Sequence, residues 1–255
     1  MIQLLIILIL FYLFFIITRY EGFTLLEEKS YVRIDKDIVD PFYCKVYDDL
    51  YNTIDIHKKE CETIVPYLNE NSDVLCLECR TGHIVQLLSN FGNITGLDSS
   101  SFMIEQSKKI YPNLSFQTLY YDPYKYKHKT HIICPLYCFH SQLDIGHFLS
   151  ICYNWLIHKG YLFISLLKPT DISQMVQHKP SYKFQHNYTF SLDVEDKPGY
   201  SIISEHIYDK HGTIKRKNIW NYQSIQLDNL IYESGLRGFK FIKQNEHIAV
   251  FSKST

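Results

Sequence analysis

A short apolar run that ends in polar residues is the first feature of this sequence that could do chemistry. Residues 74–83 read VLCLECRTGH, and Asp98 ends a second apolar run about twenty residues after this turn. In an open α/β sheet, the turn after the first strand lets the backbone approach a nucleoside, and an acid at the end of the second strand accepts both ribose hydroxyls. This spacing predicts a site for a ligand that contains a nucleoside.

The segments that would position these residues alternate between strand and helix patterns. Short apolar runs that are typical of buried strands begin near Val74, Ile94, Leu114, His131 and Tyr161. Helical patterns of apolar residues lie between them, including a strongly amphipathic stretch from Ile145 to Leu156. This alternation predicts an α/β fold, with a parallel sheet and helices on both of its faces.

The final third of the chain has a different pattern. Residues 183–193, 200–209 and 213–219 are strand-like, and Pro198-Gly199 and His211-Gly212 are turn signals between them. We expect an antiparallel insertion here. A helix over residues 224–234 and two further strands, 239–243 and 247–252, complete the predicted order.

The run at residues 74–82 resembles the first motif of class I S-adenosylmethionine-dependent methyltransferases of the small-molecule type, Val-Leu-Asp-Leu-Gly-Cys-Gly-Thr-Gly. The residues that match it are Val74, Leu75, Leu77, Cys79, Thr81 and Gly82, and Asp98 matches the family's ribose-binding acid. The resemblance extends over about Phe42 to Ser252. It implies a Rossmann-like fold, S-adenosylmethionine as cofactor, and methyl transfer to a small-molecule substrate.

Three departures from the motif affect the cofactor site. Cys76 stands where the family has an acid, and Glu78 and Arg80 replace its first two glycines. Side chains at residues 78 and 80 would either fill the site or pair with the cofactor, Glu78 with its amine and Arg80 with its carboxylate. The cofactor-binding residues that the resemblance implies are Glu78, Cys79, Arg80, Thr81, Gly82, Asp98 and Ser99. The alternative is a catalytically inactive methyltransferase-like module that binds partners at a membrane.

Each of the further candidate residues has a functional interpretation and also a purely structural one. Asp122 resembles the acid that contacts the adenine amine in the family, but it could equally be a turn residue. His140, near the end of the fourth predicted strand, is a candidate general base or a packing histidine. Tyr43, Tyr47 and Tyr51 would form either a lid over the cofactor or part of the core.

Cysteine spacing and net charge limit the other classes of function. Cys76 and Cys79 would lie on a strand next to Cys134 and Cys138, which raises the possibility of a zinc or redox site, but buried free thiols are commoner and we predict no metal. The formal net charge of −1 provides no basic field for nucleic acid. Residues 134–137, Cys-Pro-Leu-Tyr, only faintly resemble the adenine-binding motif of amino-methyltransferases, because they lack an oxygen acceptor.

The N-terminus carries a long apolar run. Residues 1–18 read MIQLLIILILFYLFFIIT, close to the roughly 17 residues that a membrane-spanning helix needs. The basic residues Arg19, Lys29, Arg33 and Lys36 all follow this run, and neither Lys nor Arg precedes it. These flanks predict an uncleaved single-pass anchor, rather than a signal peptide, with the globular domain on the cytoplasmic side. Residues 19–41 are then expected to be a juxtamembrane linker and residues 42–255 the methyltransferase-like domain.

Overall fold

The computed structural model describes residues 31–51, 54–136, 138–139, 144–168, 171, 188–209 and 211–254. Residues 1–18, the predicted membrane anchor, and His140 lie outside these ranges. Within them, no helix is both long and apolar enough to cross a membrane.

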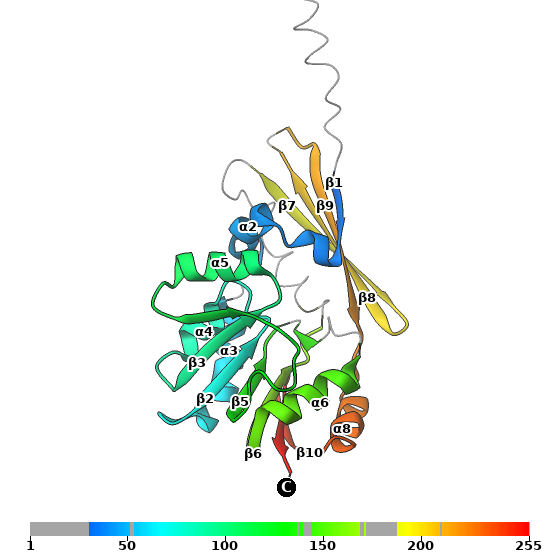
Figure 1. The fold of residues 1–255 in the computed structure, drawn as a ribbon. Coiled ribbons are helices and arrows are strands. Elements are labelled where there is room, and N and C mark those ends of the chain that lie inside the picture. The colour runs from blue at the N-terminus through cyan, green and yellow to red at the C-terminus, as the bar shows by residue number, and fades with distance from the viewer. Residues whose placement is uncertain are drawn as a thin grey trace, which may run out of the picture.

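The main sheet has seven strands in the order β10-β11-β6-β5-β2-β3-β4 (Figure 1). Their bounds are β2 Asp73–Leu77, β3 Asn93–Asp98, β4 Ser115–Thr118, β5 Lys129–Cys134, β6 Leu156–Ser165, β10 Phe239–Asn245 and β11 Ile248–Lys253. Strands β2 to β6 pair in parallel, whereas β11 is antiparallel to both β6 and β10. The predicted parallel sheet is therefore confirmed, and of the two strands predicted near the C-terminus, β11 runs antiparallel to β6.

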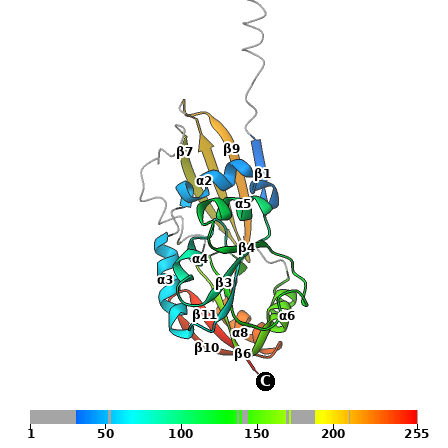
Figure 2. The same ribbon diagram turned by 60° about the vertical axis from the view of Figure 1, so that its left-hand side comes forward.

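Helices cover both faces of this sheet, as the sequence pattern predicts (Figure 2). The helices are α2 Pro41–Tyr51, α3 Ile54–Ile64, α4 His83–Leu88, α5 Ser101–Ile110, α6 Ile145–Trp155 and α8 Leu227–Gly235, with short 3-10 turns at Asp35–Ile38 and Val65–Tyr67. Apolar residues of α3, α4 and α5 form one core with the sheet, and those of α6 and α8 form another on the opposite face. Because both faces are covered, Val74 to Leu77 are all buried, which explains the continuous apolar run of this strand.

A second sheet contains β1 Tyr31–Ile34, β7 Thr189–Lys197, β8 Tyr200–Tyr208 and β9 Ile214–Gln223, in the order β1-β9-β8-β7. Strands β7, β8 and β9 are antiparallel, which confirms the predicted insertion. Strand β1 pairs in parallel with β9, so residues 31–34, which the sequence analysis assigns to a linker, are part of the second sheet. Three of the four β1 residues are exposed, and no apolar alternation marks the strand in the sequence.

Helix α2 connects the second sheet to helix α5 on the main sheet. Tyr43, Tyr47 and Tyr51 of α2 are buried in one core with Met103 of α5 and Trp220 of β9. In Figure 1, α2 accordingly lies just above α5 and to the left of the second sheet. The sequence analysis interprets these three tyrosines either as a lid over the cofactor or as part of the core. The structure shows that they are part of the core.

The fourth predicted strand is shorter than expected. The sequence pattern extends from His131 to Phe139, but β5 ends at Cys134. The next residue is Pro135, which has no N–H for a further sheet hydrogen bond. The chain therefore leaves the sheet at this proline, and the apolar residues beyond it are buried in a turn.

Candidate functional site

The turn after β2 adopts a backbone conformation that is usual for glycine. Glu78 and Arg80 have φ angles of +48° and +53°, and Gly82 has +92°. A left-handed conformation costs a residue with a Cβ roughly 1–2 kcal/mol, so the surrounding contacts must hold it in place. One such contact is the N–H of Cys79, which donates to the carbonyl of Leu97 at 2.9 Å. The loop therefore keeps a glycine-type path although two of the motif's glycines are replaced.

Asp98 lies against this loop at the end of β3 and is fully buried. Its Oδ2 accepts the N–H of Arg80, and its Oδ1 accepts the N–H of Ser100, each at 2.9 Å. Burial and the nearby charge of Glu78 raise the pKa of the Asp98 carboxyl to about 7, although Arg80 and the two N–H donors oppose this shift. Asp98 thus joins the loop to β3, where the sequence analysis expects the ribose-binding acid.

Glu78 points toward the residues that follow β3 and β4. Ser99 Oγ donates to Glu78 Oε2 at 3.0 Å, and Tyr121 OH donates to Oε1 at 3.3 Å. Glu78 as a whole residue is only 6% exposed. Its carboxylate therefore lies inside the candidate site, on the side of Ser99.

Arg80 extends toward the second sheet. Its guanidinium carbon lies 5.9 Å from the centre of the Trp220 ring, a cation–π distance. Burial lowers the pKa of the Arg80 guanidinium, but Asp98, Tyr47 and Glu78 outweigh that effect, so the group stays charged. The loop after β2 and the second sheet therefore meet at Arg80.

The remaining motif residues, Cys79, Thr81 and Gly82, pack against neighbouring parts of the fold and not into the candidate site. The sulfur of Cys79 is buried in the core beneath the loop. Thr81 Oγ1 donates to Asp48 Oδ1 of α2 at 2.5 Å, and His83 Nε2 lies 3.1 Å from the same oxygen. A Cβ on Gly82 would lie 2.6 Å from the Phe116 ring, so glycine is required there for space as well as for φ.

Asp122 is exposed and its carboxylate caps its own turn. Its Oδ1 accepts the N–H of Tyr124 at 2.9 Å, and its carbonyl accepts Trp155 Nε1 at 2.8 Å. Tyr121, one residue earlier, is the side chain that contacts Glu78. No pattern in the sequence distinguishes Tyr121 from the tyrosine before it.

A buried carboxylate orders the second sheet beside the site. Glu205 of β8 is fully buried and accepts hydrogen bonds from Tyr43 at 2.8 Å, Asn218 at 2.6 Å and Trp220 at 2.9 Å, and also from the Tyr51 hydroxyl. Four neutral donors therefore satisfy its oxygens. They fix α2 and the ring of Trp220 that faces Arg80.

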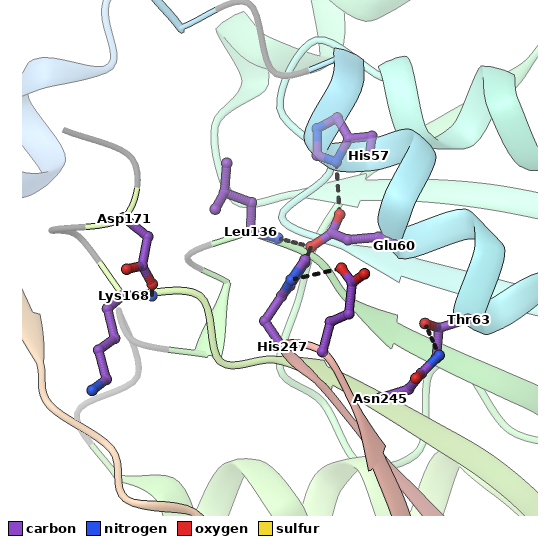
Figure 3. Close-up of polar contacts among 9 residues, drawn as sticks. His57, Glu60, Thr63, Leu136, Lys168, Asp171, Asn245 and His247 are labelled. Carbon is purple, nitrogen blue, oxygen red and sulfur yellow. Dashed lines mark hydrogen bonds and ion pairs between the residues drawn. The ribbon is translucent and has the colours of Figure 1, made fainter. Parts of the chain in front are cut away.

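A second buried carboxylate lies where β5 leaves the sheet (Figure 3). Glu60 of α3 is fully buried; its Oε2 is hydrogen-bonded to His57 Nδ1 at 2.8 Å, and its Oε1 accepts the N–H of Leu136 at 3.1 Å. His247 Nε2 lies 4.0 Å from the same Oε1. Glu60 therefore positions the turn after β5, at the edge of the sheet where open α/β folds bind ligands. The sequence around it is polar and gives no sign of this role.

The cysteines form buried thiols. Cys76, Cys79, Cys134 and Cys138 lie under the loop and the end of β5, and burial raises the pKa of each. Across the described part of the chain, no group of three or more His, Cys, Asp or Glu side chains has the arrangement of a metal site.

The chain matches no protein-family model, and no curated protein matches it in sequence. Solved structures do match. An S-adenosylmethionine-dependent methyltransferase from Clostridium acetobutylicum superposes with a TM-score of 0.59 at 12% identity, covering 84% of this chain and 98% of that one. CalS10, an amino pentose methyltransferase from Micromonospora echinaspora solved with S-adenosylmethionine bound, has a TM-score of 0.57 at 10% identity, covering 84% and 97%.

A third match is the sugar N-methyltransferase KedS8 from Streptoalloteichus, with a TM-score of 0.56 at 12% identity, covering 82% of this chain and 93% of that one. In all three the superposition spans most of both chains. At sequence identities of 10–12%, the similarity to these three structures concerns the fold. The fold of this chain is that of the class I S-adenosylmethionine-dependent methyltransferases.

Proposed function

We propose that this protein is an S-adenosylmethionine-dependent methyltransferase that acts on a small-molecule acceptor. The observation that carries the proposal is the loop at residues 78–82, which keeps the left-handed backbone of a glycine motif while Asp98 holds it in place. The sulfonium of S-adenosylmethionine already activates the methyl group, so a protein that positions cofactor and acceptor supplies much of the rate.

The charges at the site complement those of the cofactor. S-adenosylmethionine carries a sulfonium, an ammonium and a carboxylate, and its ribose supplies two hydroxyl donors. Glu78, Arg80 and Asp98 lie at the loop, and the half-buried Asp48 accepts the Thr81 hydroxyl beside it, so acids outnumber bases here. An excess of acidic groups favours a ligand with a sulfonium and an ammonium over a polyanionic nucleotide.

The acceptor would lie between the loop and the second sheet. CalS10 and KedS8, which share the fold, are described as methyltransferases of an amino pentose and of a sugar nitrogen. The formal net charge of −1 gives no support for a nucleic-acid acceptor. We therefore favour a small polar molecule, and His140 in the segment after β5 stays our candidate for a general base.

Titration calorimetry with S-adenosylmethionine tests the proposal. Asp98→Ala should bind the cofactor at least tenfold more weakly than the parent, because each charge-assisted hydrogen bond to a ribose hydroxyl is worth roughly 1.5–3 kcal/mol. Asp55→Ala is the matched control, since the exposed Asp55 carboxylate pairs with Lys58 of the same helix, α3. A folded Asp98→Ala protein with the parent's affinity would remove Asp98 from the site.

A catalytically inactive binding module is the second candidate. The observation in its favour is that the side chains of Glu78 and Arg80 both point into the site. If they close it, the double variant Glu78→Gly/Arg80→Gly gains S-adenosylmethionine binding that the parent lacks. If the protein is an enzyme, the parent binds and the double variant binds equally or more weakly.

We also propose that residues 1–18 anchor the protein in a membrane as a single-pass helix, with the domain on the cytoplasmic side. The uninterrupted apolar run and the basic residues that follow it support this. The full-length protein should then resist alkaline carbonate extraction, and its domain should be digested by protease added to the cytoplasmic side of vesicles. Release by carbonate would exclude the anchor, and protection of the domain would reverse the orientation.

A further inference from the structure

A pocket of about 400 Å³ lies at the edge of the main sheet where strands β5 and β6 begin. These strands run parallel to β2 and β3, so this edge is opposite to the one that carries Asp98 and the loop after β2. The pocket is therefore separate from the candidate cofactor site. Some of its lining residues are lysines or histidines and none is acidic; the basic ones are Lys127, His128, His158 and Lys253.

Lys253, at the end of β11, is held by carbonyl groups instead of carboxylates. Its Nζ donates to the carbonyls of Tyr153 and Leu156 at 2.7 and 2.8 Å, and it lies 4.1 Å from the centre of the Tyr153 ring. Burial lowers the pKa of the Lys253 ammonium. Among the described residues no carboxylate pairs with this ammonium, so an anion bound beside it would stabilise its charged form.

Lys127 also lacks a carboxylate partner. Its Nζ lies 4.8 Å from the centre of the ring of Tyr124, a cation–π distance, and Tyr124 is 75% exposed. Lys129, just outside the pocket, differs because it pairs with Asp73 at 2.8 Å. Within the described part of the chain, neither Lys127 nor the two pocket histidines form an ion pair with an acid. The pocket therefore carries a local positive charge on a chain whose formal net charge is −1.

The backbone beside the pocket departs from regular strand pairing. At the register shift between β5 and β6, β6 advances from Leu156 to Tyr161 while β5 advances only from one side of Thr130 to the other. The extra residues of β6 include His158 and Lys159, which are both exposed. Lys159 has a left-handed φ of +61°, and His128, just before β5, has one of +67°. Bulges and strained residues of this kind occur often at ligand sites.

The chemistry of the lining selects phosphate groups. Lysines bind phosphate through their charge, and the N–H groups of the two histidines and of Asn154 can donate to phosphate oxygens. Several positive groups without an acid suit a ligand with several negative charges better than a single carboxylate. The exposed ring of Tyr124 offers a face to a planar group, and the volume falls within the roughly 300–1,000 Å³ of small-molecule sites.

The place of the pocket in the fold favours a soluble ligand over a lipid head group. Strand β1, which follows the proposed anchor, and strand β6 lie at opposite ends of the molecule (Figure 1). We propose that this pocket is a second binding site, which takes a soluble molecule with linked phosphate groups, either a nucleoside polyphosphate or inorganic polyphosphate. This inference goes beyond the proposed function and does not depend on methyl transfer.

Titration calorimetry of the full-length protein in detergent tests the proposal, with inorganic triphosphate as the probe and no divalent cations. The folded parent should bind triphosphate with a Kd below about 1 mM. Lys127→Gln should bind it about fivefold more weakly, because it removes one positive charge from the pocket, and His158→Gln should also bind more weakly. Lys108→Gln, an exposed change of the same charge on α5, should stay within about twofold of the parent because a distant surface charge is screened.

A comparison of ATP with triphosphate, both with saturating S-adenosylmethionine present, identifies the source of the phosphates. Tighter binding of ATP assigns the site to nucleoside polyphosphates, and equal or weaker binding assigns it to the phosphate chain alone. The proposal is overturned if the folded parent binds neither probe, if Lys127→Gln and Lys108→Gln weaken triphosphate binding equally, or if S-adenosylmethionine displaces triphosphate. A protein that binds triphosphate but not S-adenosylmethionine would contradict the proposed function and support this site.

Discussion

Thr81 Oγ1 donates a hydrogen bond of 2.5 Å to Oδ1 of Asp48, and this contact joins the loop after β2 to helix α2. His83 at the start of α4 approaches the same oxygen to 3.1 Å. Asp48 thus connects α2, which carries the tyrosines buried under the second sheet, to the segment that would hold the cofactor. A substitution of Asp48 or of Thr81 should therefore destabilise both the loop and helix α2.

Asp48→Ala should lower the free energy of unfolding by about 1–2 kcal/mol, since it removes one short hydrogen bond and leaves the buried Thr81 hydroxyl without its acceptor. Amide hydrogen exchange in α2 should also accelerate. Asp49→Ala is the control, because it removes the neighbouring carboxylate from the same helix. Equal destabilisation by the two changes would show that Asp48 has no special connection to the loop.

Gly96 of β3 is predicted to tolerate no side chain. A Cβ there would lie 2.7 Å from the Phe116 ring and 2.9 Å from Cys79 Sγ, both buried. Overpacking of this kind costs typically 1–3 kcal/mol, so Gly96→Ala should lower the urea midpoint clearly. Gly235→Ala at the end of α8 is the control, because a Cβ there meets no atom within 4 Å. A Gly96→Ala protein as stable as that control would contradict the packing described.

The sequence pattern predicts the main sheet and the place of Asp98 because burial on both faces imposes it. Val74 to Leu77 must be apolar in a covered parallel strand, and the acid at Asp98 interrupts the apolar pattern at the strand's end. Strand β1 has the opposite character. It lies at a sheet edge with three exposed residues, so its composition resembles that of a linker.

The site residues that the sequence does not reveal are held by tertiary contacts. Glu205 and Glu60 are fully buried acids in segments with ordinary polar composition, and only the folded chain supplies their donors. Tyr121 contacts Glu78, while Asp122 caps a turn, a difference of one residue in loop register. No strand period extends into that loop to fix the register in advance.

Cofactor affinity should rise with pH through the pKa of Asp98, which is raised to about 7. The ribose hydroxyls donate to the ionised carboxylate, so the ligand favours the deprotonated form and releases a fraction of a proton when it binds near neutral pH. Calorimetry in buffers of different ionisation enthalpy measures that release. Asp98→Ala should show a smaller release and a flatter pH profile between about pH 6 and about pH 8. An unchanged release would assign the proton to another group.

Glu60 should be essential for the turn after β5 although no ligand atom is required to touch it. Glu60→Ala would leave the N–H of Leu136 and the ring of His57 buried without their acceptor, at roughly 1–3 kcal/mol for each group. We expect the free energy of unfolding to fall by about 2–4 kcal/mol in urea, with faster amide exchange in residues 134–139. Glu60→Gln keeps an oxygen for Leu136 and should lose about half as much. Glu62→Ala, an exposed change on the same helix, is the control, and a Glu60→Ala protein no less stable than it would show that this buried carboxylate does not hold the turn.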